Sequence, residues 1–248
     1  MILSKAHRFI FIKGVKVAGT SIEIALSPMC GQDDIVTPIT PIDELKRLGA
    51  NGGARNYSGD PAAERGYIER LRRAAVCDLV SIEPPAPVYF NHMPLRDVLR
   101  LYGSTALDYQ VVCVERHPYA KIFSWANHQL SFDSYQTGGE MRSDWHDLKN
   151  YLDQAIENRS IAAVKNIERY RGLNGLISAH VMRFENLTDD FRQFTRSLGI
   201  DYRSTLPHAK RGIFANDLNP RDLLDNRQLN SINELFQEEF DTFNYKSL

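Results

Sequence analysis

The sequence predicts an α/β fold: one domain over residues 1–248, with a mostly parallel central sheet flanked by helices. Short apolar runs typical of buried strands alternate with longer segments of helical periodicity, and this alternation favours parallel strands covered on both faces. The composition is that of an ordinary globular protein, with 43% hydrophobic and 25% charged residues. A chain of this length buries roughly 70–75% of its unfolded surface, which is enough for one sizeable domain.

The first elements form a strand, a loop and a helix. The apolar run Phe9–Ile12 predicts a buried strand. Thr20 or Ser21 is expected to cap a helix that continues through residues 22–26. Clusters of turn-forming residues interrupt the regular pattern of strands and helices over residues 30–87. We therefore expect an insertion-like surface segment there, with one polar helix at 62–75.

Regular structure resumes after this segment, and a proline in the first turn and a terminal glycine mark several of the helix ends. The expected strands are 88–90, 109–115 and 179–184, and the expected helices are 95–102, 118–130, 145–158, 161–170, 188–198 and 226–240.

Charge and cysteine usage exclude several functional classes. The net charge of −1 does not favour nucleic acid or an anionic membrane as a partner. The three cysteines are irregularly spaced, which argues against a disulfide framework and gives no metal-ligand pattern. No apolar run reaches the length of a signal-peptide core or a membrane span, so we expect a cytoplasmic protein.

The loop after the first strand predicts an anion site. Amide groups converge where a strand leads through small residues into a helix, and the helix dipole favours negative charge. Lys16 adds a cation, and Thr20 and Ser21 add hydroxyl donors, while Ala18 and Gly19 permit close approach of a ligand. Gly14 and Gly19 have the spacing of a P-loop, but Thr20 stands where that motif has its lysine. The alternative is a strand-to-helix turn that binds nothing.

A second anion site is predicted where the strand at 109–115 ends. Arg116 directly follows this strand, at the sheet edge where open α/β sheets hold ligands. Ser124 lies two helical turns further on, so both side chains can face the same ligand. The guanidinium group of Arg116 and the hydroxyl of Ser124 together suit a terminal phosphate. The alternative is an arginine that caps the strand and a serine that bonds to its own helix.

Both elements resemble one family. The segment Phe11-Ile-Lys-Gly-Val-Lys-Val-Ala-Gly-Thr-Ser21 resembles the 5′-phosphosulfate loop of sulfotransferases that use 3′-phosphoadenosine 5′-phosphosulfate (PAPS), and 111–124 resembles their 3′-phosphate element. The branch resembled is that of carbohydrate sulfotransferases related to heparan sulfate 2-O-sulfotransferase, including short bacterial members. Val15 and Val17 depart from the family pattern, which usually has proline and often a hydroxyl residue there. The resemblance covers residues 30–87 poorly.

The resemblance implies a PAPS-dependent sulfotransferase with a sulfotransferase fold and a P-loop-like strand–loop–helix. It implies that Lys16, Val17, Ala18, Gly19, Thr20 and Ser21 hold the 5′-phosphosulfate, and that Arg116 and Ser124 hold the 3′-phosphate. Lys210, Arg211 and Gly212 then form either a late loop over this phosphate or a solvated basic turn. The acceptor is a hydroxyl, with a saccharide favoured by the branch, and no metal is expected.

Two residues are candidates for the base that accepts the proton of the acceptor. His92 follows the expected strand at 88–90 and should emerge at the sheet edge that carries Lys16. A neutral histidine suits proton transfer near pH 7, and the related 2-O-sulfotransferases use a histidine in a comparable place. Glu23 is the second candidate, ranked lower because it lies inside the first helix. Two other functions stay open, namely a P-loop nucleotide kinase that uses ATP and magnesium, and a non-catalytic nucleotide sensor.

Overall fold

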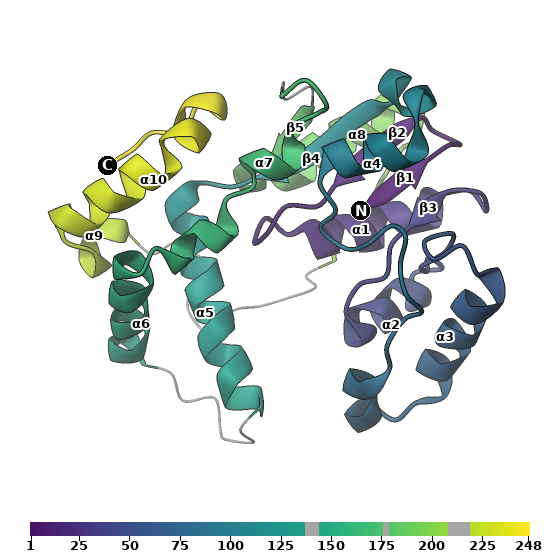
Figure 1. The fold of residues 1–248 in the computed structure, drawn as a ribbon, viewed down its shortest axis with the longest axis horizontal. Helices are drawn as coiled ribbons and strands as arrows, with labels where there is room; N and C mark the ends of the chain where they lie inside the picture. Colours follow the sequence, from purple (N-terminus) through teal and green to yellow (C-terminus); the bar gives the residue numbers. More distant parts are fainter. Residues whose placement is uncertain (137–143, 176–178, 208–218) are drawn as a thin grey trace. The chain divides into compact units, whose positions relative to one another are not determined.

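The computed structural model describes residues 1–136, 144–175, 179–207 and 219–248. The chain divides into two compact units, each built from separate segments of the sequence (Figure 1). Unit 1 comprises residues 1–14, 18–114 and 168–209, and unit 2 comprises residues 15–17, 115–167 and 210–248. No helix in the described ranges combines the length and the apolar character needed to cross a bilayer.

The sheet has five strands in the order β3-β1-β2-β4-β5. The strands are β1 (Ile2–Ser4), β2 (Phe9–Ile12), β3 (Ile35–Val36), β4 (Gln110–Glu115) and β5 (His180–Arg183). β2 and β4 run parallel, with Phe9 opposite Gln110 and Ile12 opposite Cys113. Because parallel neighbours end at the same edge of a sheet, the chain leaves β2 and β4 on the same side.

The α/β class is confirmed, but the sheet is mixed rather than mostly parallel. β1 pairs antiparallel with both β2 and β3, with Ile2 opposite Phe11 on one side and Val36 on the other. The sequence prediction missed β1 and β3, which are only three and two residues long. The short connection of residues 5–8 folds β1 back onto β2 as a hairpin, and this geometry makes the pair antiparallel.

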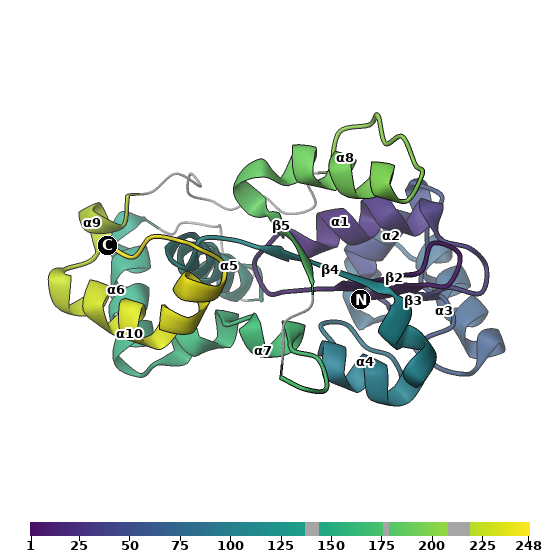
Figure 2. The ribbon, with the colours of Figure 1, turned by 90° about the horizontal axis from the view of Figure 1, so that it is seen from above.

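Helices cover both faces of the sheet in unit 1, with α1 and α8 on one face and α4 on the other (Figure 2). Apolar side chains of the strands, including Phe9, Phe11 and Val112, are fully buried between these layers. The helices with residues in unit 1 are α1 (Gly19–Leu26), α2 (Pro41–Gly49), α3 (Pro61–Arg73), α4 (Leu95–Tyr102), α7 (Ile167–Tyr170) and α8 (Leu187–Ser197).

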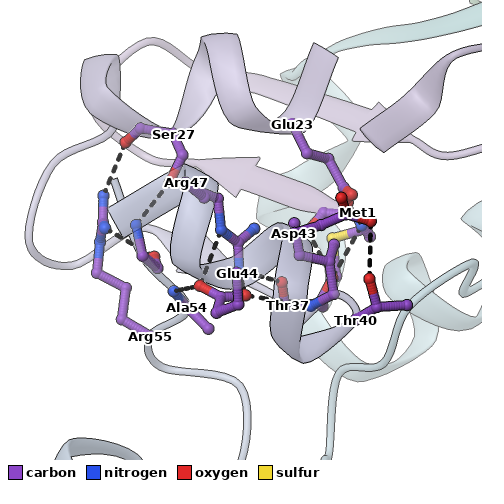
Figure 3. Close-up of polar contacts among 12 residues, drawn as sticks. Met1, Glu23, Ser27, Thr37, Thr40, Asp43, Glu44, Arg47, Ala54 and Arg55 are labelled. Atoms are coloured by element: carbon purple, nitrogen blue, oxygen red, sulfur yellow. Dashed lines mark hydrogen bonds and ion pairs between the residues drawn. The ribbon is translucent and has the colours of Figure 1, made fainter. Parts of the chain in front are cut away.

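Polar contacts link different parts of residues 30–87 to one another, and Arg55 also links this segment to the rest of unit 1 (Figure 3). Arg47 of α2 is fully buried, forms a salt bridge with Glu44 and donates to the Thr37 carbonyl at 2.9 Å. Arg55 donates to the carbonyl of Cys30 at 2.9 Å and to that of Ser27 at 3.3 Å. The segment expected to be a surface insertion therefore also supplies β3 to the sheet and buried ion pairs to the core.

The expected strand at 88–90 is wrong. This segment is irregular, and the amide groups of Val88 and Tyr89 both donate to the carbonyl of Tyr57, at 2.8 and 2.9 Å. Val88 and Phe90 remain 47% and 42% exposed, so the apolar triplet does not enter the core.

Unit 2 is helical and has its own apolar core. Buried aliphatic and aromatic side chains of α5, α6 and α10 form this core, among them Leu152, Ile232 and Phe236. α10 begins with a capping box between Asp225 and Gln228, which satisfies two of the amide groups at the helix start. Its helices are α5 (Pro118–Gln136), α6 (Trp145–Glu157), α9 (Pro220–Leu223) and α10 (Asn226–Thr242), and the expected helix at 161–170 is instead a 3₁₀ turn (Ser160–Val164) followed by α7.

Candidate functional site

The loop between β2 and α1 contains two residues in the left-handed region. Lys16 has φ of 60° and Ala18 has φ of 61°, a conformation that costs free energy for residues such as lysine and alanine. α1 begins at Gly19, so Thr20 and Ser21 lie in its first turn and the predicted cap at either residue is wrong. Ala18 occupies the cap position and supplies no side-chain acceptor, and the first turn holds no acidic residue. The first turn of α1 therefore supplies no carboxylate of its own to offset the positive end of the helix dipole.

Gly19 is required by the packing of Lys13 beneath the loop. A Cβ atom added at Gly19 would lie 2.6 Å from Cγ of Lys13. The side chain of Lys13 passes this point to reach Glu23, with 2.7 Å between Nζ and Oε2. Both side chains are almost completely buried, so the ion pair fixes the end of β2 to α1. This is a structural reason for the glycine that differs from the close ligand approach expected from the sequence.

Glu23 is engaged through both carboxylate oxygens. Its Oε1 accepts from the amino group of Met1, and its Oε2 faces Lys13, while the side chain has no exposed surface. Burial opposes ionisation, but Lys13 and the Met1 amino group outweigh it and lower the pKa of Glu23 to about 2. A carboxylate without exposed surface, whose two oxygens already face the Met1 amino group and Lys13, offers no oxygen within reach of an acceptor hydroxyl.

His92 lies beside the start of the loop. Its Nδ1 is 3.1 Å from the carbonyl oxygen of Lys13, and Arg169 donates to the His92 carbonyl at 3.3 Å. A carbonyl only accepts, so Nδ1 carries the proton and Nε2 carries the lone pair of the neutral ring. Burial and the adjacent Lys13 ammonium lower the pKa of His92 to about 3, so the ring is neutral at physiological pH. This residue reaches the loop from an irregular segment before α4, without the strand expected at 88–90.

Arg116 is the first residue after β4 and is 5% exposed. Its backbone amide donates to Oε1 of Glu115 at 2.9 Å. The same oxygen lies 2.7 Å from Nζ of Lys121, which also contacts Glu239 at 2.6 Å. All three charged side chains are essentially inaccessible, and burial raises the pKa of Glu115 against the opposing effect of Lys121. Ser124 is half-buried in the second turn of α5.

Asn166 holds the loop next to Lys16, a contact that the sequence did not predict. Its Oδ1 accepts from the amide of Val15 at 2.7 Å, and its Nδ2 donates to the carbonyl of the same residue at 3.1 Å. The two residues are 151 positions apart, and no motif marks an asparagine between two short helical turns.

The predicted residues fall in both units. Lys16, Val17, Arg116 and Ser124 belong to unit 2, whereas Ala18, Gly19, Thr20, Ser21 and His92 belong to unit 1. The parallel pairing of β2 and β4 brings the starts of both predicted anion loops to one edge of the sheet. Lys210, Arg211 and Gly212 lie outside the described residues.

Within the described ranges, no group of three or more histidine, cysteine, aspartate or glutamate side chains has a metal-binding arrangement. Comparison of the chain with protein-family models, with curated proteins and with solved structures gives no match.

Proposed function

We propose that the chain is a PAPS-dependent sulfotransferase that transfers a sulfuryl group to a hydroxyl, with a saccharide as the favoured acceptor class. The main support is the β2–loop–α1 element, in which a lysine precedes a helix start that has no side-chain cap and no acidic residue in its first turn. Such a start favours an anionic group. The parallel neighbour β4 leads directly into Arg116, the residue that we assign to the 3′-phosphate.

PAPS would supply the sulfuryl group and, as leaving group, the phosphate of the product 3′-phosphoadenosine 5′-phosphate (PAP). Lys16 and the first amides of α1 bind the 5′ end, and Lys16 stabilises the charge that grows on the leaving oxygen. Arg116 and Ser124 bind the 3′-phosphate and orient the nucleotide for in-line displacement.

His92 accepts the proton of the acceptor hydroxyl at Nε2 as the new oxygen–sulfur bond forms. The assignment is supported by the hydrogen bond from Nδ1 to the Lys13 carbonyl, which fixes both the tautomer and the ring orientation. The choice of His92 over Glu23 is supported by the two ion pairs that occupy the Glu23 carboxylate.

The test is transfer of ³⁵S from labelled PAPS to a panel of saccharides and phenols, with product separated by chromatography. Wild type should label at least one hydroxyl acceptor, and Lys16→Ala should label the same acceptor much more slowly but still measurably. A parallel reaction with γ-³²P-ATP and magnesium tests the kinase alternative. Transfer of phosphate to an acceptor without any transfer of sulfate would overturn the proposal.

A further inference from the structure

The backbone of Val15 is held at both of its polar groups by one side chain. Asn166 accepts from its N–H at 2.7 Å and donates to its C=O at 3.1 Å, and Asn166 has no exposed surface. A pair of hydrogen bonds from one rigid amide to one residue fixes that peptide in position and in rotation. Both residues belong to unit 2.

The residue that follows this clamp is Lys16, whose φ of 60° lies in the left-handed region. Ala18 repeats the strained conformation two residues later. A residue without glycine's freedom keeps such a conformation only where its surroundings determine it, because the strain costs about 1–3 kcal/mol. Asn166 supplies such a determinant immediately before Lys16.

Asn166 is itself anchored in the buried charge cluster of unit 2. The backbone amide groups of Asn166 and Ile167 both donate to Oε1 of Glu239. The other oxygen of Glu239 contacts Lys121, which contacts the carboxylate of Glu115. A continuous buried chain of polar contacts therefore runs from Val15 to the residue before Arg116.

We propose that Asn166 is a positioning residue for Lys16: by clamping both backbone groups of Val15, it holds the strained loop in the conformation that presents the lysine to the leaving oxygen. This inference rests on the proposed sulfotransferase function. Asn166 does not touch the nucleotide in this account. Its effect on turnover passes through Lys16 alone.

The variant Asn166→Ala removes both contacts, and Asn233→Ala is its matched control. Asn233 is also an asparagine of unit 2 with both amide atoms engaged, by Tyr119 at 2.6 Å and by the Leu248 carbonyl at 2.8 Å. Each variant loses one accepted and one donated side-chain hydrogen bond, but only Asn166→Ala loses a contact to the loop.

The first readout needs no nucleotide. Hydrogen exchange of the Val15 amide, resolved by NMR or by mass spectrometry of loop peptides, should quicken by at least about 10-fold in Asn166→Ala, because loss of its acceptor exposes the N–H. Asn233→Ala should leave this rate unchanged. Equal rates in wild type and Asn166→Ala would overturn the inference.

The second readout is turnover in two backgrounds. Asn166→Ala should lower turnover by about 10²-fold, the scale expected for misplacing a catalytic group by about 1 Å. In a Lys16→Ala background the same change should lower turnover by less than about 3-fold, because the lysine that Asn166 positions is already absent. The same fold loss in both backgrounds, matched by a loss of folded protein, would show a purely structural role and overturn the inference.

If Asn166→Ala does not fold, Asn166→Asp keeps the size and the acceptor oxygen but removes the donor to the Val15 carbonyl. It should lower turnover relative to Asn233→Ala, and equal turnover of these two variants overturns the inference. Failure of the proposed function is seen in wild type itself, as absence of both PAP binding and sulfuryl transfer. Failure of the inference alone is seen in an active wild type whose turnover does not depend on Asn166.

Discussion

Protonation of His92 should destabilise the fold, and the variant His92→Asn isolates this effect. Asparagine tolerates the φ of 61° found at His92, and its amide nitrogen replaces Nδ1–H as donor to the Lys13 carbonyl. The folded-state pKa is about 3 and the reference value is 6.5, so between these values the unfolded chain binds a proton that the folded chain does not. Stability therefore rises with pH across this window.

The magnitude follows from the two pKa values. Each pH unit below 6.5 costs about 1.4 kcal/mol, which amounts to about 2 kcal/mol near pH 5. Urea denaturation of both proteins near pH 5 and near pH 7.5 measures this loss, because the other titrating groups are common to both and cancel in the difference. Wild type should lose about 2 kcal/mol more than His92→Asn. An identical loss in the two proteins would refute the assignment of a buried, neutral histidine.

The same variant tests the catalytic role. Loss of the lone pair at Nε2 should lower the single-turnover rate by about 10²–10⁴-fold while PAP affinity is kept. The low pKa of His92 also predicts that the wild-type single-turnover rate falls on acidification only near pH 3, rather than near pH 6.5. A single-turnover rate in His92→Asn within about 3-fold of wild type would remove His92 from the mechanism.

Three further predictions concern the loop and its supports. Lys16→Ala should reduce turnover far more than it weakens PAP binding, and turnover within about 2-fold of wild type would exclude its role. Arg116→Ala should reduce the preference for PAP over AMP by about 10- to 150-fold in calorimetric titrations, and an unchanged preference would refute the 3′-phosphate assignment. Glu23→Ala removes the carboxylate that faces the buried Lys13 ammonium, so the free energy of unfolding in urea should fall by about 3–5 kcal/mol. A fall of less than about 1 kcal/mol would show that the ion pair is not structural.

Local signals predicted the elements that carry the candidate site. β2, β4 and α5 have strong apolar runs or a proline at the helix start, and the structure places them near their expected positions. The mixed sheet could not be predicted from such local signals, because β1 and β3 are too short to show the alternation of apolar and polar residues that marks a strand. Their pairing depends on contacts such as Ile2 with Val36, which no local pattern records.

The support of the loop is also invisible in the sequence. Lys13 directly follows β2 and Glu23 lies ten residues later in α1, and only the fold brings Nζ and Oε2 within 2.7 Å of each other. Asn166 contacts Val15 across 151 positions. The apolar triplet at 88–90 gave a strand prediction that was wrong. The amide groups of Val88 and Tyr89 donate to the Tyr57 carbonyl instead of to a neighbouring strand.

The most direct test of the central claim is calorimetric titration of the chain with PAP, AMP and magnesium-ATP. The proposed sites for both phosphates predict that PAP binds at least about 10-fold more tightly than AMP, because only PAP offers a 3′-phosphate to Arg116. At about 100 times its dissociation constant, PAP should also stabilise the fold by about 2.7 kcal/mol. Equal affinity for PAP and AMP, or binding of magnesium-ATP without binding of PAP, would contradict the claim.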